Sequence, residues 1–114
     1  INCCPRIRRK VRAGVSDVGQ VDLNSNLLNL LAPKLPLFQL RGPWNLQCIV
    51  RDSEFYFLEV NPRFSGGVPL SIAAGCDLVQ NLLEWYLNKP LTKFDTLEDG
   101  LVMMKYEQEL FVKC

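Results

Sequence analysis

Two strand-like runs joined by a short polar segment constrain the fold of this chain more than any other feature. Residues 44–50 and 55–60 are rich in β-branched and aromatic side chains, and Arg51-Asp52-Ser53-Glu54 connects them. This pattern predicts a β-hairpin. The dipeptide Gly42-Pro43 before the first run is typical of a turn, so the hairpin should begin there.

Further strands and helices are expected on both sides of the hairpin. Alternating polar and apolar residues, capping residues and prolines mark their limits. The sequence predicts an exposed strand over 6–12, a turn or loop over 14–20, a helix capped by Asn24 and Ser25 that stops at Pro33 and Pro36, a short helix from Pro69 to Gly75, a helix from Asp77 to Asn88, and late strands over 101–104 and 109–112. We expect one α+β domain over residues 1–114, a mostly antiparallel sheet with packed helices.

Charge and hydropathy narrow the kinds of partner. The formal net charge is only +1, and no apolar run approaches the roughly 18 residues of a membrane span. The basic run Arg6, Arg8, Arg9, Lys10 and Arg12 has no aromatic residues among it on which bases could stack. We therefore expect no nucleic-acid partner, no membrane partner and a cytoplasmic location.

Cysteine and histidine usage limits the chemistry. There is no histidine, which excludes Cys–His and Ser–His nucleophiles. The five cysteines form no Cys-x-x-Cys pair, and we interpret them as reduced thiols. Cys48 and Cys76 lie among apolar residues and are expected in the core.

Polar residues at the end of the second hairpin strand are candidates for metal binding. Glu59 and Asn61 are two residues apart, so they share one face of a strand. A carboxylate and an amide oxygen are the hard donors that Mg²⁺ prefers, with phosphates and waters completing its octahedron. The alternative is a solvent-facing Glu at an ordinary strand end.

Gln47 in the first hairpin strand strengthens the metal hypothesis. If paired residue numbers sum to 106, Gln47 lies directly opposite Glu59. That register requires an odd-length loop such as Asp52-Ser53-Glu54. A two-residue Asp52-Ser53 loop would pair Gln47 with Leu58 instead and send Glu59 to the other face.

Two arginines are candidates for anion contact. Arg63 follows Asn61 by two residues, and a guanidinium matches phosphate oxygens in a fork-like way. A surface salt bridge is its alternative interpretation. In the basic run, alternate residues would form one positive strand face, either for an anion or simply solvated. Arg12, beside the turn at Gly14, is the best single candidate for substrate contact.

These residues resemble a known family. Gly42-Pro43-Trp44-Asn45-Leu46-Gln47 and the segment Phe57-Leu58-Glu59-Val60-Asn61-Pro62-Arg63-Phe64-Ser65-Gly66-Gly67 are similar to the C-terminal part of an ATP-grasp domain of the carbamoyl-phosphate-synthase type. The resemblance implies that Gln47, Glu59 and Asn61 bind Mg²⁺ (or Mn²⁺) on ATP. It also implies that Arg63 contacts phosphate during catalysis. A ligase that joins a small carboxylate substrate to an amine or a thiol through an acyl phosphate is the implied activity.

The resemblance also sets expectations about the whole protein. Carbamoyl phosphate synthases usually continue Asn-Pro-Arg with a serine and another arginine, whereas Phe64-Ser65-Gly66-Gly67 follows here. That favours a stand-alone ATP-grasp protein. We expect a C-terminal portion whose N-terminal domain and lysine-bearing subdomain are absent, and which is inactive alone and needs that region or a partner chain. A homodimer and a non-catalytic binding or assembly module are left open.

Overall fold

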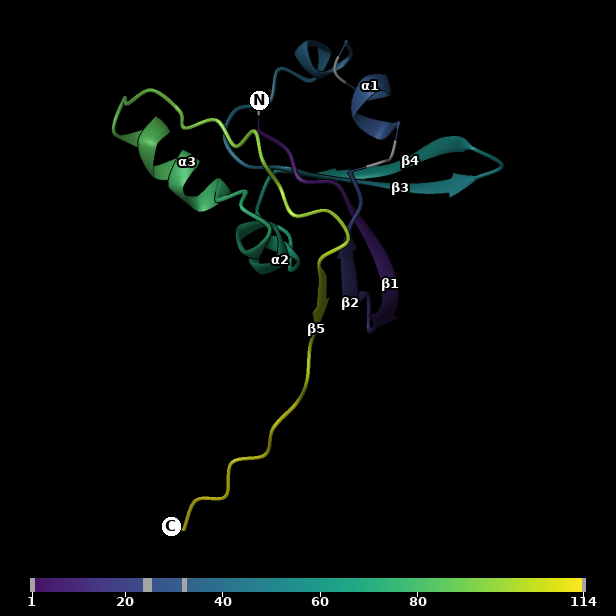
Figure 1. Cartoon of the computed structure of the whole chain (residues 1–114), viewed down its shortest axis with the longest axis vertical. Coiled ribbons are helices and arrows are strands. Elements are labelled where there is room, and N and C mark those ends of the chain that lie inside the picture. Colours follow the sequence, from purple (N-terminus) through teal and green to yellow (C-terminus); the bar gives the residue numbers. More distant parts are fainter. Residues whose placement is uncertain (1, 24–25, 32, 114) are drawn as a thin grey trace.

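The described residues form two antiparallel sheets and three short α-helices. The computed structural model describes residues 2–23, 26–31 and 33–113. One sheet has the strand order β1-β2-β5, and the other is the hairpin β3-β4 (Figure 1). The strands are β1 (Arg6–Arg12), β2 (Val15–Val21), β3 (Asn45–Arg51), β4 (Glu54–Asn61) and β5 (Val102–Met104). The helices are α1 (Leu27–Leu31), α2 (Val68–Ala73) and α3 (Leu78–Tyr86), with a 3₁₀ turn η1 at Leu35–Phe38.

Most expected elements form, and the α+β class is confirmed. Asp77 caps α3, because its carboxylate accepts the backbone N–H groups of Val79 and Gln80. Gly75 ends α2 with a φ of +94°, and a Cβ there would lie 3.1 Å from the carbonyl oxygen of Thr96. The expected α1 cap, Asn24 and Ser25, lies outside the described residues.

Two of the expected elements differ from the structure, and in both the pairing with other strands explains the difference. The run 14–20 is no loop beyond its turn, because Val15–Val21 is strand β2 in the centre of its sheet, paired with β1 and β5. Pairing on both sides outweighs the low strand propensity of Asp and Gly. Residues 109–112 form no strand: Leu110 and Phe111 are 87% and 93% exposed on an extended tail that leaves the sheet (Figure 1).

The core lies between α2, strand β2 and the segment that leads into β5. Its buried members are Cys4, Val21, Leu70, Ala74 and Cys76. Burial raises the pKa of the Cys76 thiol to about 11, so this thiol stays protonated at neutral pH. The core prediction is therefore confirmed for Cys76, whereas Cys48 is only partly buried.

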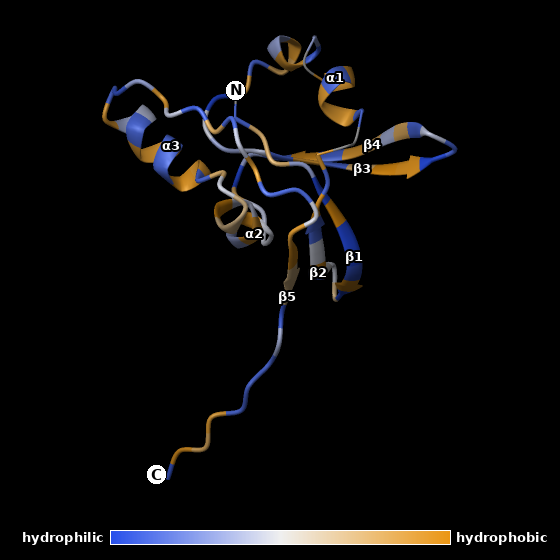
Figure 2. Ribbon diagram, in the orientation of Figure 1, coloured by the Kyte–Doolittle hydropathy of each residue, from blue (hydrophilic) through white to orange (hydrophobic). Residues whose placement is uncertain are grey.

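Apolar side chains also cover parts of the surface. Hydrophobic stretches lie along β3 and β4 (Figure 2), and Ile49, Val50 and Leu58 on these strands are more than half exposed. On α3, Trp85 and Tyr86 are 51% and 76% exposed, so they do not belong to the core. No helix in the described part of the chain is long and apolar enough to cross a membrane.

A hydrogen-bonded carboxylate fixes the segment after α3. The side chain of Glu84 accepts bonds from the hydroxyl and backbone N–H of Thr92 and from the amides of Gln80 and Asn81. These hydrogen bonds, above all those from Thr92, stabilise the ionised carboxylate and lower the pKa of Glu84 to about 2. Asn2 extends this network, because its amide donates to the Asn81 side chain and to the Thr92 carbonyl oxygen.

We expect the Glu84→Gln variant to lose stability at neutral pH. A carboxyl whose pKa falls from 4.5 to about 2 on folding stabilises the fold above pH 4.5, and this contribution disappears as the pH falls through about 2. The difference in Tm between wild type and variant should therefore narrow between pH 5 and pH 2. Thermal unfolding followed by circular dichroism measures it. A difference independent of pH would contradict the assignment.

Candidate metal–phosphate site

The hairpin brings three polar side chains together at its base. Gln47 on β3 pairs directly with Glu59 on β4, and Asn45 pairs with Asn61. The Gln47 amide donates to Glu59 Oε1 at 2.7 Å. The Asn61 amide donates to the same oxygen at 2.9 Å. The predicted cluster of Gln47, Glu59 and Asn61 therefore exists as one hydrogen-bonded group.

Gln47 pairs with Glu59 as the metal hypothesis requires, but the turn that produces this register differs from the expected one. Arg51 pairs with Glu54, so the turn is the two-residue Asp52-Ser53 type, with φ values of +52° and +65°. The expectation of an odd-length loop is wrong. A register shift between Gln47 and Cys48 makes Leu58 an extra residue on β4. This β-bulge restores the pairing of Gln47 with Glu59.

The donor chemistry of the cluster fits a phosphate-bound divalent cation. Glu59 is exposed, and Gln47 and Asn61 are half-buried beside it. One carboxylate and two amides offer three oxygen donors with a single negative charge, which suits Mg²⁺ when phosphates supply the remaining charge. Within the described residues no three His, Cys, Asp or Glu side chains gather for a metal, so the two amides are needed.

Arg63 extends from the loop that follows β4. Its side chain is exposed and donates to the neighbouring carbonyl oxygen of Phe64 at 3.1 Å. The ion pairs found among the described residues do not include Arg63, so nothing there supports the surface salt bridge. The guanidinium retains donors for an anion.

Strand β1 contributes two arginines that sequence reasoning did not single out. Arg8 donates to Gln47 Oε1 at 3.1 Å and to the Gly14 carbonyl oxygen at 2.6 Å. Arg6 donates to the hydroxyls of Ser65 and Ser71 and to the carbonyl oxygen of Gly67. The signal was the alternation of basic residues along the strand, but alternation does not show which arginine meets the hairpin.

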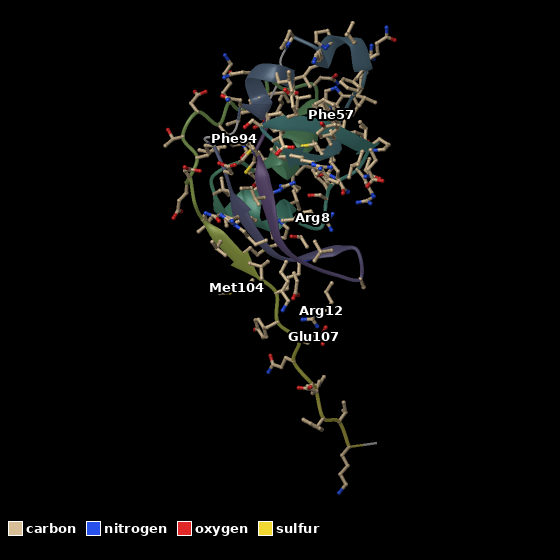
Figure 3. The ribbon with its side chains drawn as sticks, turned by 90° about the vertical axis from the view of Figure 1, so that its right-hand side faces the viewer. Arg8, Arg12, Phe57, Phe94, Met104 and Glu107 are labelled. Atoms are coloured by element: carbon tan, nitrogen blue, oxygen red, sulfur yellow. The ribbon has the colours of Figure 1, made fainter. Side chains whose placement is uncertain are left out.

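Arg12 lies at the other end of β1, away from the cluster (Figure 3). Its guanidinium is bound at 2.7 Å to Glu107 and at 3.2 Å to Asp17. Arg12 and these two acids line an open recess of about 320 Å³ together with Ala13, Ser16, Lys105 and Tyr106. The structure therefore brings Arg8, rather than Arg12, to the hairpin cluster.

Comparison with known proteins identifies the family, and that family is consistent with the α+β fold. Residues 3–109 match the family described as ATP-grasp in the biosynthetic pathway with Ter operon. The chain belongs to this ATP-grasp family. It is also 37% identical over 65 residues to the carbamoyl phosphate synthase large chain of Thermoplasma acidophilum. That match covers 56% of this chain and 6% of the relative, so the chain spans only a small part of the relative's length.

Proposed function

We propose that this chain supplies the metal- and phosphate-binding part of an ATP-dependent carboxylate–amine or carboxylate–thiol ligase. The observation that carries the proposal is the contact of Gln47, Glu59 and Asn61 around a single carboxylate oxygen. Arg63 follows two residues later with an exposed guanidinium. Membership of the ATP-grasp family supports ATP as the nucleotide and Mg²⁺ or Mn²⁺ as the cation.

In the proposed reaction, a substrate carboxylate attacks the γ-phosphorus of ATP and ADP leaves. The resulting acyl phosphate is then attacked by an amine or a thiol, which releases phosphate and a proton. A bound cation would neutralise phosphate charge. Gln47, Glu59 and Asn61 would hold it, and Arg63 would donate to the phosphoryl oxygens as charge develops on them. Arg12 remains a proposed contact for the substrate carboxylate.

We further propose that this site is one wall of a nucleotide site and that another region supplies the second wall. The exposed apolar residues of the hairpin support this, because large exposed apolar patches mark interaction surfaces. The covering region would be the N-terminal domain and lysine-bearing subdomain or a partner chain. A homodimer and a cytoplasmic location also remain predictions. A non-catalytic binding or assembly module is the alternative function.

ADP release tests the proposal. The chain is joined to the preceding region of its full reading frame, and release of ADP from ATP is followed with a coupled assay. We expect release that requires Mg²⁺ or Mn²⁺, stops with EDTA and rises when a carboxylate substrate is supplied. ATP binding without cation-dependent ADP release would favour the non-catalytic module instead.

A further inference from the structure

The Gln47 side chain is held between two partners with opposite chemical demands. Arg8 can only donate, so it must face the amide oxygen of Gln47, at 3.1 Å. The ionised carboxylate of Glu59 can only accept, so it must face the amide nitrogen, at 2.7 Å. The amide is therefore oriented by its chemistry, with its oxygen turned toward β1 and away from Glu59.

A cation shared by Gln47 and Glu59 needs the opposite orientation. Both residues would have to present oxygen to it, so the Gln47 amide must turn. Its NH₂ group would then face the guanidinium of Arg8, and two donors cannot bond to each other. The bond between Arg8 and Gln47 and the ligation of a cation shared with Glu59 therefore compete, because they require opposite orientations of one amide.

Among the residues that the structure describes, no acid forms an ion pair with Arg8. Its acceptors, Gln47 Oε1 and the Gly14 carbonyl oxygen, are both neutral. Arg12 on the same strand, in contrast, is paired with two carboxylates. Arg8 is exposed, so its bond to Gln47 is weak enough to be displaced. A guanidinium without an acidic partner is suited to an anionic oxygen.

We propose that Arg8 is a latch on Gln47: a cation bound at Gln47, Glu59 and Asn61 opens it and frees Arg8 to bind a phosphate oxygen. Arg8 is thus a positioning residue in the absence of metal and an anion-binding residue in its presence. The inference rests on the proposed function. It predicts that Mg²⁺ and a phosphate chain bind cooperatively, each raising the affinity for the other.

The test uses the ¹⁵N-labelled chain of residues 1–114 in NMR titrations, with Mg²⁺ and inorganic tripolyphosphate as probes. The side-chain NH₂ resonances of Gln47 report on the turning of its amide. With Mg²⁺ alone, Arg8→Ala should bind roughly tenfold more tightly than wild type, because the latch no longer competes. The same substitution in a Gln47→Ala background should change affinity much less, which separates the latch from simple charge removal.

With saturating Mg²⁺ present, Arg8→Ala should bind tripolyphosphate roughly tenfold more weakly than wild type. Arg9→Ala is the matched control, since it removes the same charge from the neighbouring position, where Arg9 donates to Gln20. An Mg²⁺ response that requires Glu59 but is equal in wild type and Arg8→Ala would overturn the latch alone. No Glu59-dependent response to Mg²⁺ with tripolyphosphate would overturn the proposed metal site as well.

Discussion

Replacing Glu59 by Gln should lower the rate of Mg²⁺-dependent ADP release by roughly a hundredfold or more in the full-length protein. Glutamine keeps the size of the side chain but removes the only carboxylate of the cluster. The two amides that now donate to Glu59 Oε1 would lose their ionised acceptor. The protein would then offer a cation neutral oxygens alone, and the affinity of the site for the cation would fall.

The control for this experiment is Glu54→Gln. Glu54 is an exposed acid on the same strand, beside the turn, and it pairs with Arg51 rather than with the cluster. It should leave ADP release unchanged. Because Glu59 is also exposed, the free energy of unfolding of the Glu59→Gln variant should lie within about 0.5 kcal/mol of the wild-type value. Equal ADP release by wild type and Glu59→Gln would refute the enzymatic assignment.

The hairpin shows how far local sequence patterns determine a site. The pairing of Gln47 with Glu59 was one of two registers that the sequence left open, whereas the two strands themselves could be predicted from strand propensity. The bulge at Leu58 could not. Asp52-Ser53 forms a two-residue turn with both residues in the left-handed region, and the bulge then corrects the register. The two-residue turn and the bulge compensate each other, so that Asn45, Leu46 and Gln47 have the same partners as with a regular three-residue loop.

Long-range contacts explain the other differences. Strand β2 was not predicted, because Asp17 and Gly19 have low strand propensity. It forms because β1 and β5 pair with it on its two sides. Among the basic residues of β1, the sequence singled out Arg12 for its place beside the turn at Gly14 and gave no reason to choose Arg8. Only the placement of the hairpin distinguishes Arg8, which meets Gln47, from Arg12, which meets Asp17 and Glu107.

Arg6→Ala should be strongly destabilising. The Arg6 side chain joins strand β1 to the loop after Arg63, donating to Ser65 Oγ at 2.8 Å and to the Gly67 carbonyl oxygen at 3.3 Å. It also donates to the hydroxyl of Ser71, a fully buried residue on α2. Removing the guanidinium leaves that hydroxyl without this partner. We expect a loss of about 2–3 kcal/mol in the free energy of unfolding.

A loss of this size corresponds to a fall in Tm on the order of 10 °C for a domain of this length, measurable by circular dichroism. Arg9→Ala, on the same strand, should leave the free energy of unfolding within about 0.5 kcal/mol of wild type. The Arg9 side chain is exposed, and its hydrogen bond among the described residues goes to Gln20. The double variant Arg6→Ala/Ser71→Ala should lose less stability than the sum of the two single variants, since both substitutions remove the same hydrogen bond. Additive losses would show instead that Arg6 acts through Ser65 and Gly67, and a wild-type Tm in Arg6→Ala would refute its role in holding the Arg63 loop.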